Sequence, residues 1–415
     1  MFFKNYNYVK NKEVYVLTLL ILFSIFIRVP VIFLYGDGGL QNEWLILVNN
    51  LTNHGILAFD YHDQNLAKYL FPNLYMPPLY AYYIYFFSIF SFEGQNYVLT
   101  VLFSQVLLAS VSVAIFYKIG KIFFSQKISF IISILYSLFP LHVYASSQIS
   151  SISLQTFLTI LFFYFFFQLI EKRSFLNIFF ISFIGGLLIL LRQEFVAVLA
   201  LSLFYAFIFY KISIKKIFLI LLISLITISP YLIRNIIVFN TFTITKTTGY
   251  NFWKGSHPEA KDLQGSEIIN NKLQKKIDKI PKDELYGVNF DNLFLNEAII
   301  NIKKDPTRYL TLFIKKTLSF LFIDINSPHP DYYNPFHYLP VLLFGITSLI
   351  GIGLSDKKSY KLNYLILIFF FYVFIFSTVS ILPRYKLIIL PIQIIFTGVL
   401  IEYLKKLIFL NNKKN

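Results

Sequence analysis

The sequence predicts an all-α protein that crosses a membrane many times. Of its 415 residues, 57% are hydrophobic and only 14% are charged, whereas soluble domains average about 25% charged residues. The apolar residues form long blocks separated by short lysine-rich stretches, and about 20 apolar residues suffice for a helix to span a bilayer. The sequence lacks the alternation over about ten residues that is typical of an outer-membrane barrel. We therefore expect a polytopic bundle of helices.

Twelve apolar segments follow one another along the chain, and two of them are poor candidates for full spans. They lie near residues 14–35, 77–92, 97–117, 128–145, 153–170, 175–191, 194–210, 215–238, 308–323, 336–354, 361–381 and 385–409. The second is short and begins with Pro77 and Pro78, and the ninth carries Lys315 and Lys316, each costing about 2.5–3.5 kcal/mol at mid-bilayer. We predict about ten full spans, in a bundle of about 10–13 transmembrane helices, and two helices that lie along or re-enter the outer face.

The net charge of +16 comes from lysines and arginines that flank the apolar segments. This distribution is typical of the positive-inside rule, so it does not indicate a nucleic-acid partner. The first apolar stretch, Val14 to Tyr35, is longer than a signal-peptide core of about 7–15 residues and lacks a small-residue cleavage site. We predict a multi-pass protein of the cytoplasmic (inner) membrane, in contact with membrane lipids and without a nucleic-acid partner.

Placing the lysine-rich loops in the cytoplasm puts the two longest loops on the extracytoplasmic face. The predicted organisation is an amino-terminal transmembrane module (1–240) with a catalytic first loop (36–76), an extracytoplasmic loop (241–307) and a carboxy-terminal transmembrane module (308–415). Both loops contain amphipathic runs, around Trp44 and around Phe294. Such runs favour helices that lie in the membrane interface.

Two acidic residues stand at the start of the first loop. Asp37 follows the first apolar segment directly, and Glu43 lies six residues further on. A carboxylate at the membrane surface can take a proton from an acceptor hydroxyl. The alternative is a solvated loop aspartate and a glutamate on a surface helix, and the charge pattern alone does not separate the two interpretations.

Four arginines lie at or near outer boundaries of apolar segments: Arg28, Arg192, Arg234 and Arg384. Arginines that share one membrane face can bind a phosphate through paired hydrogen bonds, although each could instead anchor its helix. Arg28 is placed to extend outward along the first helix. Arg192 could also pair with Glu194 where two helices meet in a hairpin.

Histidines are few, and no motif of metal-ligand spacing is present. The chain has no cysteine, which excludes disulfides and thiolate chemistry. His257 follows Gly255 and Ser256 in the second loop, where it contacts a ligand or is an ordinary loop histidine. We predict no cofactor and no metal site, while a divalent metal requirement stays open.

Several short motifs occur in order along nearly the whole chain. They are Asp37 with Glu43-Trp44, Tyr75-Met76-Pro77-Pro78-Leu79, Leu191-Arg192-Gln193-Glu194, Pro230-Tyr231-Leu232-Ile233-Arg234-Asn235, Gly249-Tyr250-Asn251-Phe252-Trp253-Lys254-Gly255, Asn296-Glu297-Ala298 with Asp305-Pro306, and Pro383-Arg384-Tyr385-Lys386 with Pro391. On these motifs the chain resembles bacterial membrane glycosyltransferases of the GT-C fold. The resemblance is to the group of dolichyl-phosphate-mannose-protein mannosyltransferases and lipid A aminoarabinose transferases, which is glycosyltransferase family 39-like.

The resemblance implies an enzyme that moves a sugar from a polyprenyl-phosphate donor to a lipid, glycan or protein acceptor at the extracytoplasmic face. It implies that an acid of the first loop, Asp37 or Glu43, is the catalytic base. The residues implied in binding the donor phosphate or substrate are Arg192, Glu194, Arg234, His257, Arg384 and Tyr385.

The chain departs from this family at three points. Asp37 stands seven residues before Trp44 rather than three to five, so either Asp37 or Glu43 could match the family's acid. Tyr75 and Met76 replace the Glu-Lys pair of the aminoarabinose transferases. The acid expected near 150–153 is absent, because Ser151-Ile152-Ser153 stands there.

Two other functions fit a polytopic chain. A lipid-linked oligosaccharide polymerase, ligase or flippase would also bind polyprenyl phosphates, but its largest loop and charged residues would more often lie elsewhere. A secondary transporter would need charged or broken helices at mid-membrane. Here the charges gather at one boundary, which favours the enzyme.

Overall fold

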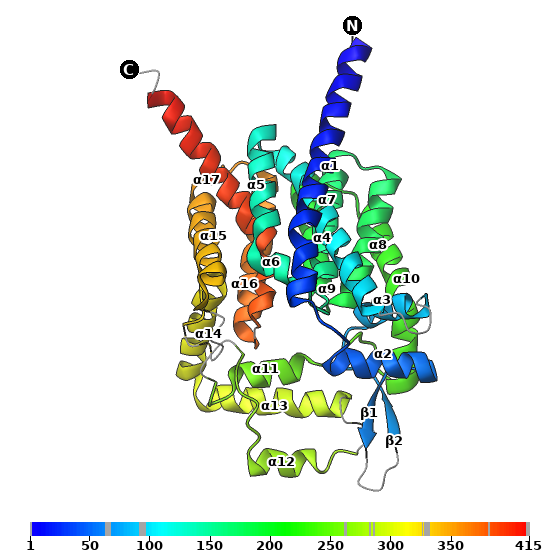
Figure 1. Cartoon of the computed structure of the whole chain (residues 1–415). Helices are drawn as coiled ribbons and strands as arrows, with labels where there is room; N and C mark the ends of the chain where they lie inside the picture. The colour runs from blue at the N-terminus through cyan, green and yellow to red at the C-terminus, as the bar shows by residue number, and fades with distance from the viewer. Residues whose placement is uncertain are drawn as a thin grey trace.

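A computed structural model describes residues 2–411 except 63–67, 91–96, 261–263, 282–283, 285–286, 326, 328–332 and 381. The chain forms a bundle of helices with both termini at one end (Figure 1). The two long loops lie at the opposite end, which we call the loop end. Within the described residues the strands are limited to one antiparallel hairpin, β1 (Ala58–His62) and β2 (Lys68–Pro72), in which Ala58 pairs with Pro72.

Among the described residues, six helices are long and apolar enough to cross a membrane. They are α1 (Phe2–Tyr35), α4 (Tyr97–Phe123), α7 (Ile152–Glu171), α10 (Ile214–Phe239), α15 (Pro335–Leu354) and α16 (Tyr360–Thr378). Shorter apolar helices are α5 (Gln126–Leu138), α8 (Phe175–Leu191) and α9 (Phe195–Tyr210), and the chain continues to α17 (Leu390–Asn411). These observations confirm an all-α polytopic membrane protein, while the number of about ten full spans stays a prediction.

The bundle has one large hydrophobic core. It contains buried residues from both predicted transmembrane modules, such as Phe166 of α7 and Tyr364 of α16, whose rings stack with centroids 4.1 Å apart. Stacked aromatic pairs add to the stability that area burial provides. In sequence-distant contacts, α17 packs against α5 and α15, and α14 (Pro306–Leu321) packs against α16. The predicted modules therefore pack together, and their boundaries stay predictions.

Helix α5 is interrupted near the loop end by Pro140. A proline lacks the N–H that a continuing helix needs, and it holds the preceding residue away from helical geometry. Phe139 accordingly has extended backbone angles, φ −61° and ψ 116°. The chain resumes as the short helix α6 (Pro140–Ala145) and reaches α7 through the segment 146–151, which we call the α6–α7 segment.

Short helices cover the loop end, as the sequence predicts. They are α2 (Asn42–His54) and α3 (Pro78–Ile89) in and after the first loop, and α11 (Thr248–Ser256), α12 (Asn271–Ile277) and α13 (Val288–Lys304) in the second loop. Helix α2 is amphipathic, because Leu47, Val48 and Leu51 are buried in the main core while Glu43 is exposed. It ends at Gly55, whose φ of +68° suits glycine.

Helix α14 enters the bundle only partway. Its final carbonyl, on Leu321, lies 2.6 Å from the place that a Cβ on Gly345 would take, in the middle of α15. Lys316 is buried, and its ammonium donates to the carbonyls of Gly255 and Val379 at 2.5 and 2.9 Å. These carbonyls give the buried lysine polar partners, while a re-entrant α14 stays a prediction.

Candidate active site

Asp37 lies at the loop end between α1 and the α6–α7 segment. Helix α1 finishes with a tight turn at Gly36, where a Cβ would lie 2.3 Å from the carbonyl oxygen of Ile32. The backbone N–H of Asp37 donates to the carbonyl of Ser147 at 3.2 Å. Its carboxylate Oδ2 accepts the N–H of Ile149 at 2.6 Å. Asp37 is half-buried, and its second carboxylate oxygen has no hydrogen-bond partner among the described residues.

The α6–α7 segment is held from behind by α3 and α4. Gln105 of α4 is fully buried, and its amide nitrogen donates to the carbonyl of Gln148 at 2.9 Å. Tyr80 of α3 donates its hydroxyl to the amide oxygen of Gln105 at 2.7 Å. Trp44 of α2 packs edge-on against Tyr80, with ring centroids 4.8 Å apart. The segment that binds Asp37 is therefore supported by α4 and α3, and α2 packs against α3 from the first loop.

Glu43 lies in a different environment from Asp37. It is exposed in the first turn of α2 and has no hydrogen-bond partner among the residues that the structure describes. An acidic residue in the first turn interacts favourably with the helix dipole, which is sufficient to explain its position. The structure thus joins Asp37, but not Glu43, to the α6–α7 segment.

Arg192 and Tyr385 meet beside the first turn of α7. Arg192 ends α8, and its Nε donates to the amide oxygen of Gln155 in α7 at 2.9 Å. Its guanidinium lies 5.0 Å from the ring centre of Tyr385, in the 3₁₀ helix η3 (Pro383–Ile388), a favourable cation–π contact. Glu194 begins α9 close by, but it forms no ion pair with Arg192 within 4.0 Å in the described part of the chain. The first turn of α7 thus separates Asp37 from this group.

Arg384 is the most accessible of the four arginines predicted to bind phosphate. It is exposed in η3, next to Tyr385, and no described residue forms a hydrogen bond or ion pair with it. A guanidinium without a protein partner keeps its full set of donors for a ligand. Arg384 is therefore the arginine best placed to meet an anion from outside the bundle.

Arg234 and Arg28 bind parts of the protein itself. Arg234 of α10 donates to the carbonyls of Asn73 at 2.7 Å and Leu57 at 3.3 Å, and so ties the first loop to α10. The expectation that Arg28 extends outward is wrong, because Arg28 is 0% exposed and bonded inside the bundle. Inside the bundle the guanidinium contacts the side chains of Ser24, Ser137 and His142.

His257 lies in the second loop with both ring nitrogens engaged. Its Nε2 lies 2.9 Å from the carbonyl of Ile268, and its Nδ1 accepts the N–H of Glu259 at 3.1 Å. Arg308 of α14 donates to the carbonyl of His257 at 2.9 Å. Burial is the main cause that lowers the pKa of His257 below its usual value. The arrangement fixes the loop through a neutral imidazole.

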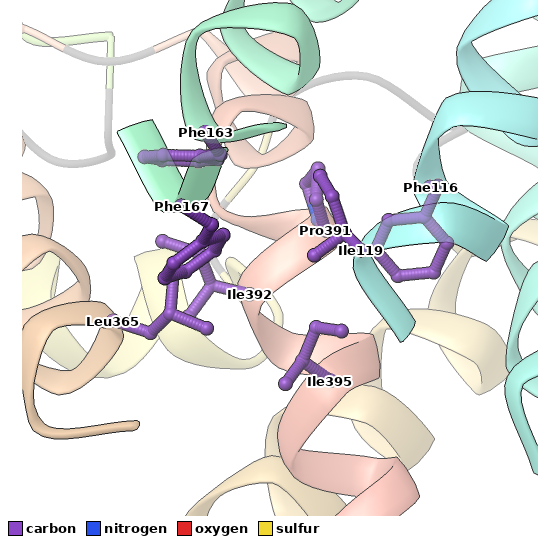
Figure 2. A pocket seen from close by; sticks show the side chains of 8 residues that line it. All are labelled: Phe116, Ile119, Phe163, Phe167, Leu365, Pro391, Ile392 and Ile395. Atoms are coloured by element: carbon purple, nitrogen blue, oxygen red, sulfur yellow. The ribbon is translucent and has the colours of Figure 1, made fainter. Parts of the chain in front are cut away.

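Two cavities differ in character. A polar groove of about 810 Å³ runs along α14, with Asp305, Arg308 and Lys315 in its lining. Figure 2 shows a small cavity lined by apolar side chains of α4, α7, α16 and α17, including Phe167 and Pro391. This cavity measures about 10 Å³, roughly the space of one water molecule. It is a packing gap in the core, since no polar atom lines it.

The residues around Asp37 do not fit a divalent metal site. Among the described residues, no group of three His, Cys, Asp or Glu side chains could hold a metal ion. Magnesium and calcium prefer several oxygen ligands, usually with more than one carboxylate. The neighbour of Asp37 is instead the N–H of Ile149, which is a donor and cannot bind a cation.

Three residues of this site escaped the sequence analysis: Tyr80, Gln105 and Gln155. The two glutamines carried a usable signal, because each interrupts an apolar helix, where a polar side chain must find a partner. Tyr80 carried none, since tyrosines are abundant throughout the chain. Its contact with Gln105 becomes visible only when α3 and α4 are packed together.

Comparisons with known proteins agree with this architecture. Residues 76–233 match the family model described as dolichyl-phosphate-mannose-protein mannosyltransferase, which confirms the predicted resemblance over that range. No curated protein matches the sequence.

Solved structures of the oligosaccharyltransferase from Archaeoglobus fulgidus are similar to the chain. The apo form has a TM-score of 0.57 at 12% identity and covers 97% of this chain and 51% of its own. The complex with an inhibitory peptide and a dolichol-phosphate also has a TM-score of 0.57 at 12% identity, covering 98% and 52%. The form tethered to an acceptor peptide has a TM-score of 0.55 at 10% identity, covering 98% and 51%. The chain thus spans about half the length of these structures and shares their fold, which confirms the GT-C-like bundle.

Proposed function

We propose that this protein is a membrane glycosyltransferase that moves a sugar from a polyprenyl-phosphate donor to an acceptor at the loop end. The observation that carries the proposal is the half-buried carboxylate of Asp37, fixed by the N–H of Ile149 beside the start of α7. The fold shared with an oligosaccharyltransferase and the mannosyltransferase family match support the same reaction class. The loop end then faces the extracytoplasmic side of the cytoplasmic membrane.

In the proposed reaction, an acceptor hydroxyl attacks the anomeric carbon of the sugar. The bond between that carbon and the phosphate oxygen breaks, and its electron pair leaves with the phosphate. The sugar develops oxocarbenium character as this happens. Asp37 accepts the hydroxyl proton through its second carboxylate oxygen, which has no partner among the described residues. Glu43 is the alternative base.

The leaving phosphate requires positive charge on the other side of the sugar. We assign this role to Arg384 and Arg192, with Tyr385 and Glu194 shaping the same region through their contacts and charges. Arg192 is held by Gln155 through its Nε and by a side-chain hydrogen bond to Tyr385, and these contacts fix its guanidinium in this region. Arg234 and His257 have protein partners, so we assign them a supporting role in holding the two loops.

The proposal is tested with purified protein in lipid nanodiscs. A panel of polyprenyl-phosphate and polyprenyl-diphosphate sugars is added with lipid, glycan and peptide acceptors, and donor consumption is followed by mass spectrometry. We expect one donor to be consumed and its free lipid phosphate to appear together with a glycosylated acceptor. Movement of an intact lipid-linked sugar across the bilayer without bond cleavage would favour a flippase. Uptake of a soluble substrate without donor consumption would favour a transporter.

A further inference from the structure

Arg28 is a fully buried cation whose described partners are all neutral. Its Nη1 donates to the hydroxyl of Ser24 at 2.7 Å and to that of Ser137 at 3.4 Å, and its Nη2 lies 3.0 Å from Nδ1 of His142. No described carboxylate pairs with it. Arginine keeps its charge in proteins, and a buried charge without a counter-ion is unfavourable. A helix anchor does not require so unfavourable a group, since apolar packing would serve.

His142 connects Arg28 to the break between α5 and α6. Because a guanidinium can only donate, Nδ1 of His142 is the acceptor and its proton resides on Nε2. That Nε2 lies 3.3 Å from the hydroxyl of Tyr136 in α5, and the two rings lie against each other with centroids 4.6 Å apart. His142, which belongs to α6, therefore ties α6 to α5 through Tyr136 and to α1 through Arg28, beside the break at Pro140.

The chain from His142 leads directly to Asp37. Residues Ser147 and Ile149 follow α6 at once, and their backbone groups bind the N–H and the carboxylate of Asp37. Two residues nine positions apart thus contact this unit: Arg28 inside α1, and Asp37 just after α1 ends. Because Asp37 follows α1 closely and the α6–α7 segment follows α6 directly, a displacement at one contact is transmitted to the other.

We propose that Arg28 and His142 are positioning residues, which hold α6 and the α6–α7 segment in place and thereby orient the carboxylate of Asp37. This inference rests on the proposed function in one respect, the role of Asp37 as the base. The contact of the α6–α7 segment with α1 is independent of that role and is tested separately.

The kinetic test uses variants of the two residues in the full-length protein. Arg28→Met removes the charge and the donors, so kcat falls about 10- to 100-fold, as a displacement of about 1 Å can cause, while the KM for the donor lipid is unchanged. Arg28→Lys keeps the charge, so its kcat should lie between those of Arg28→Met and the unmodified protein. It should not reach the unmodified value, because one ammonium cannot reproduce the forked contacts of the guanidinium. His142→Gln should keep most of the kcat of the unmodified protein, since its amide oxygen can accept from Arg28. His142→Leu has no acceptor and should lose as much kcat as Arg28→Met.

A second measurement tests the position of the α6–α7 segment relative to Asp37 and does not depend on enzyme activity. The chain contains no cysteine, so Gly38→Cys combined with Ser150→Cys gives a unique pair that flanks the contact between Asp37 and Ile149. A Cβ on Gly38 meets no heavy atom within 4 Å, so the new side chain fits. A short bismaleimide joins the pair in the otherwise unchanged protein. Adding Arg28→Met lowers the cross-linking yield to that of a single-cysteine control.

Lys316→Met is the matched control for loss of a buried cation, because Lys316 binds the carbonyls of Gly255 and Val379. We expect it to leave the cross-linking yield unchanged. If Arg28→Met lowers only the melting temperature, with cross-linking and kcat intact, Arg28 is a packing residue and the inference is wrong. If cross-linking is lost but even the unmodified protein transfers no sugar, the positioning contact stands and the proposed function fails. Should Arg28→Met not fold, Arg28→Lys and the two His142 variants decide by the same readouts.

Discussion

The two long loops at the loop end differ in what holds them. The first loop is part of the main core, since Leu40, Leu47 and Val48 are buried together with residues of the spanning helices. Arg234 adds hydrogen bonds to two of its carbonyls. The second loop has a small core of its own, in which Trp253, Leu273, Phe294 and Ala298 are buried. The described part of the first loop is therefore packed into the core of the bundle, and the buried cluster of the second loop is a separate packing unit.

The second loop is joined to the bundle through both backbone groups and side chains, among them Lys316, which donates to the carbonyl of Gly255. Ser380, after α16, donates its N–H to the carbonyl of Asn251 at 3.1 Å. Gly255 lies so close to this chain that a Cβ would be 2.4 Å from the carbonyl carbon of Val379. Because chemistry needs fixed groups, the packing of the first loop into the main core suits the role proposed for Asp37.

The largest expected effect concerns Asp37 in the first loop. Asp37→Asn removes the base while keeping the size of the side chain, so the transfer rate falls by about 10²- to 10⁴-fold without loss of expression. Turnover is measured with the active donor in nanodiscs. Glu43→Gln is the matched control and should retain most of the activity, because Glu43 is exposed on α2. A normal rate for Asp37→Asn together with a dead Glu43→Gln would move the base to Glu43.

Much of the fold could be predicted because its signals are local. The length of apolar blocks indicates the spanning helices, and paired lysines indicate that α14 does not cross fully. The site depends on contacts between distant residues, such as Asp37 with Ile149, which are 112 positions apart. The boundary arginines look alike in the sequence, yet Arg234 binds carbonyls while Arg384 is exposed. That difference depends on packing and could not be predicted.

A second pair of variants tests whether the second loop is a separate unit. Trp253→Ala removes a ring that is 1% exposed, and such truncations cost about 3–5 kcal/mol. We expect rapid proteolysis within 241–307 while the melting temperature of the bundle changes little. Leu47→Ala, in the main core, should cost about 2–5 kcal/mol and lower the melting temperature of the whole protein. Equal shifts of the main transition in both variants would contradict a separate unit.

A third pair compares an exposed arginine with an engaged one. Arg384→Ala should raise the KM for the donor about tenfold or more, since a hydrogen bond to a charged group contributes about 1.5–3 kcal/mol, and leave the melting temperature unchanged. Arg234→Ala should instead lower stability by about 1–3 kcal/mol, because it releases the carbonyls of Leu57 and Asn73. Donor titrations and thermal melts of both variants separate the roles. A stability loss confined to Arg384→Ala would make that residue an anchor.

The smallest expected effect is a pH dependence of the second loop. The folded loop lowers the pKa of His257 chiefly by burial, while the hydrogen bond to the carbonyl of Ile268 and the charge of Glu259 act in the opposite direction and the charge of Arg308 lowers the pKa further. The neutral ring suits its partners, because protonation of Nδ1 would abolish the bond that it accepts from the N–H of Glu259. The unfolded loop therefore binds more protons than the folded loop as pH falls through about 6.5, and stability must decrease with it.

The predicted loss of stability at low pH can be measured on the second loop separately from the bundle. We expect proteolysis within 241–307 to be faster at pH 5.5 than at pH 7.5, by less than Trp253→Ala causes, with a protease whose own rate is corrected on an unfolded peptide. His257→Gln cannot be protonated, so it should flatten the pH profile while the bundle melts as before. An unchanged profile in His257→Gln would mean that another group titrates. No histidine is among the described hydrogen-bond partners of Asp37, so the proposed base should keep its position over the same range.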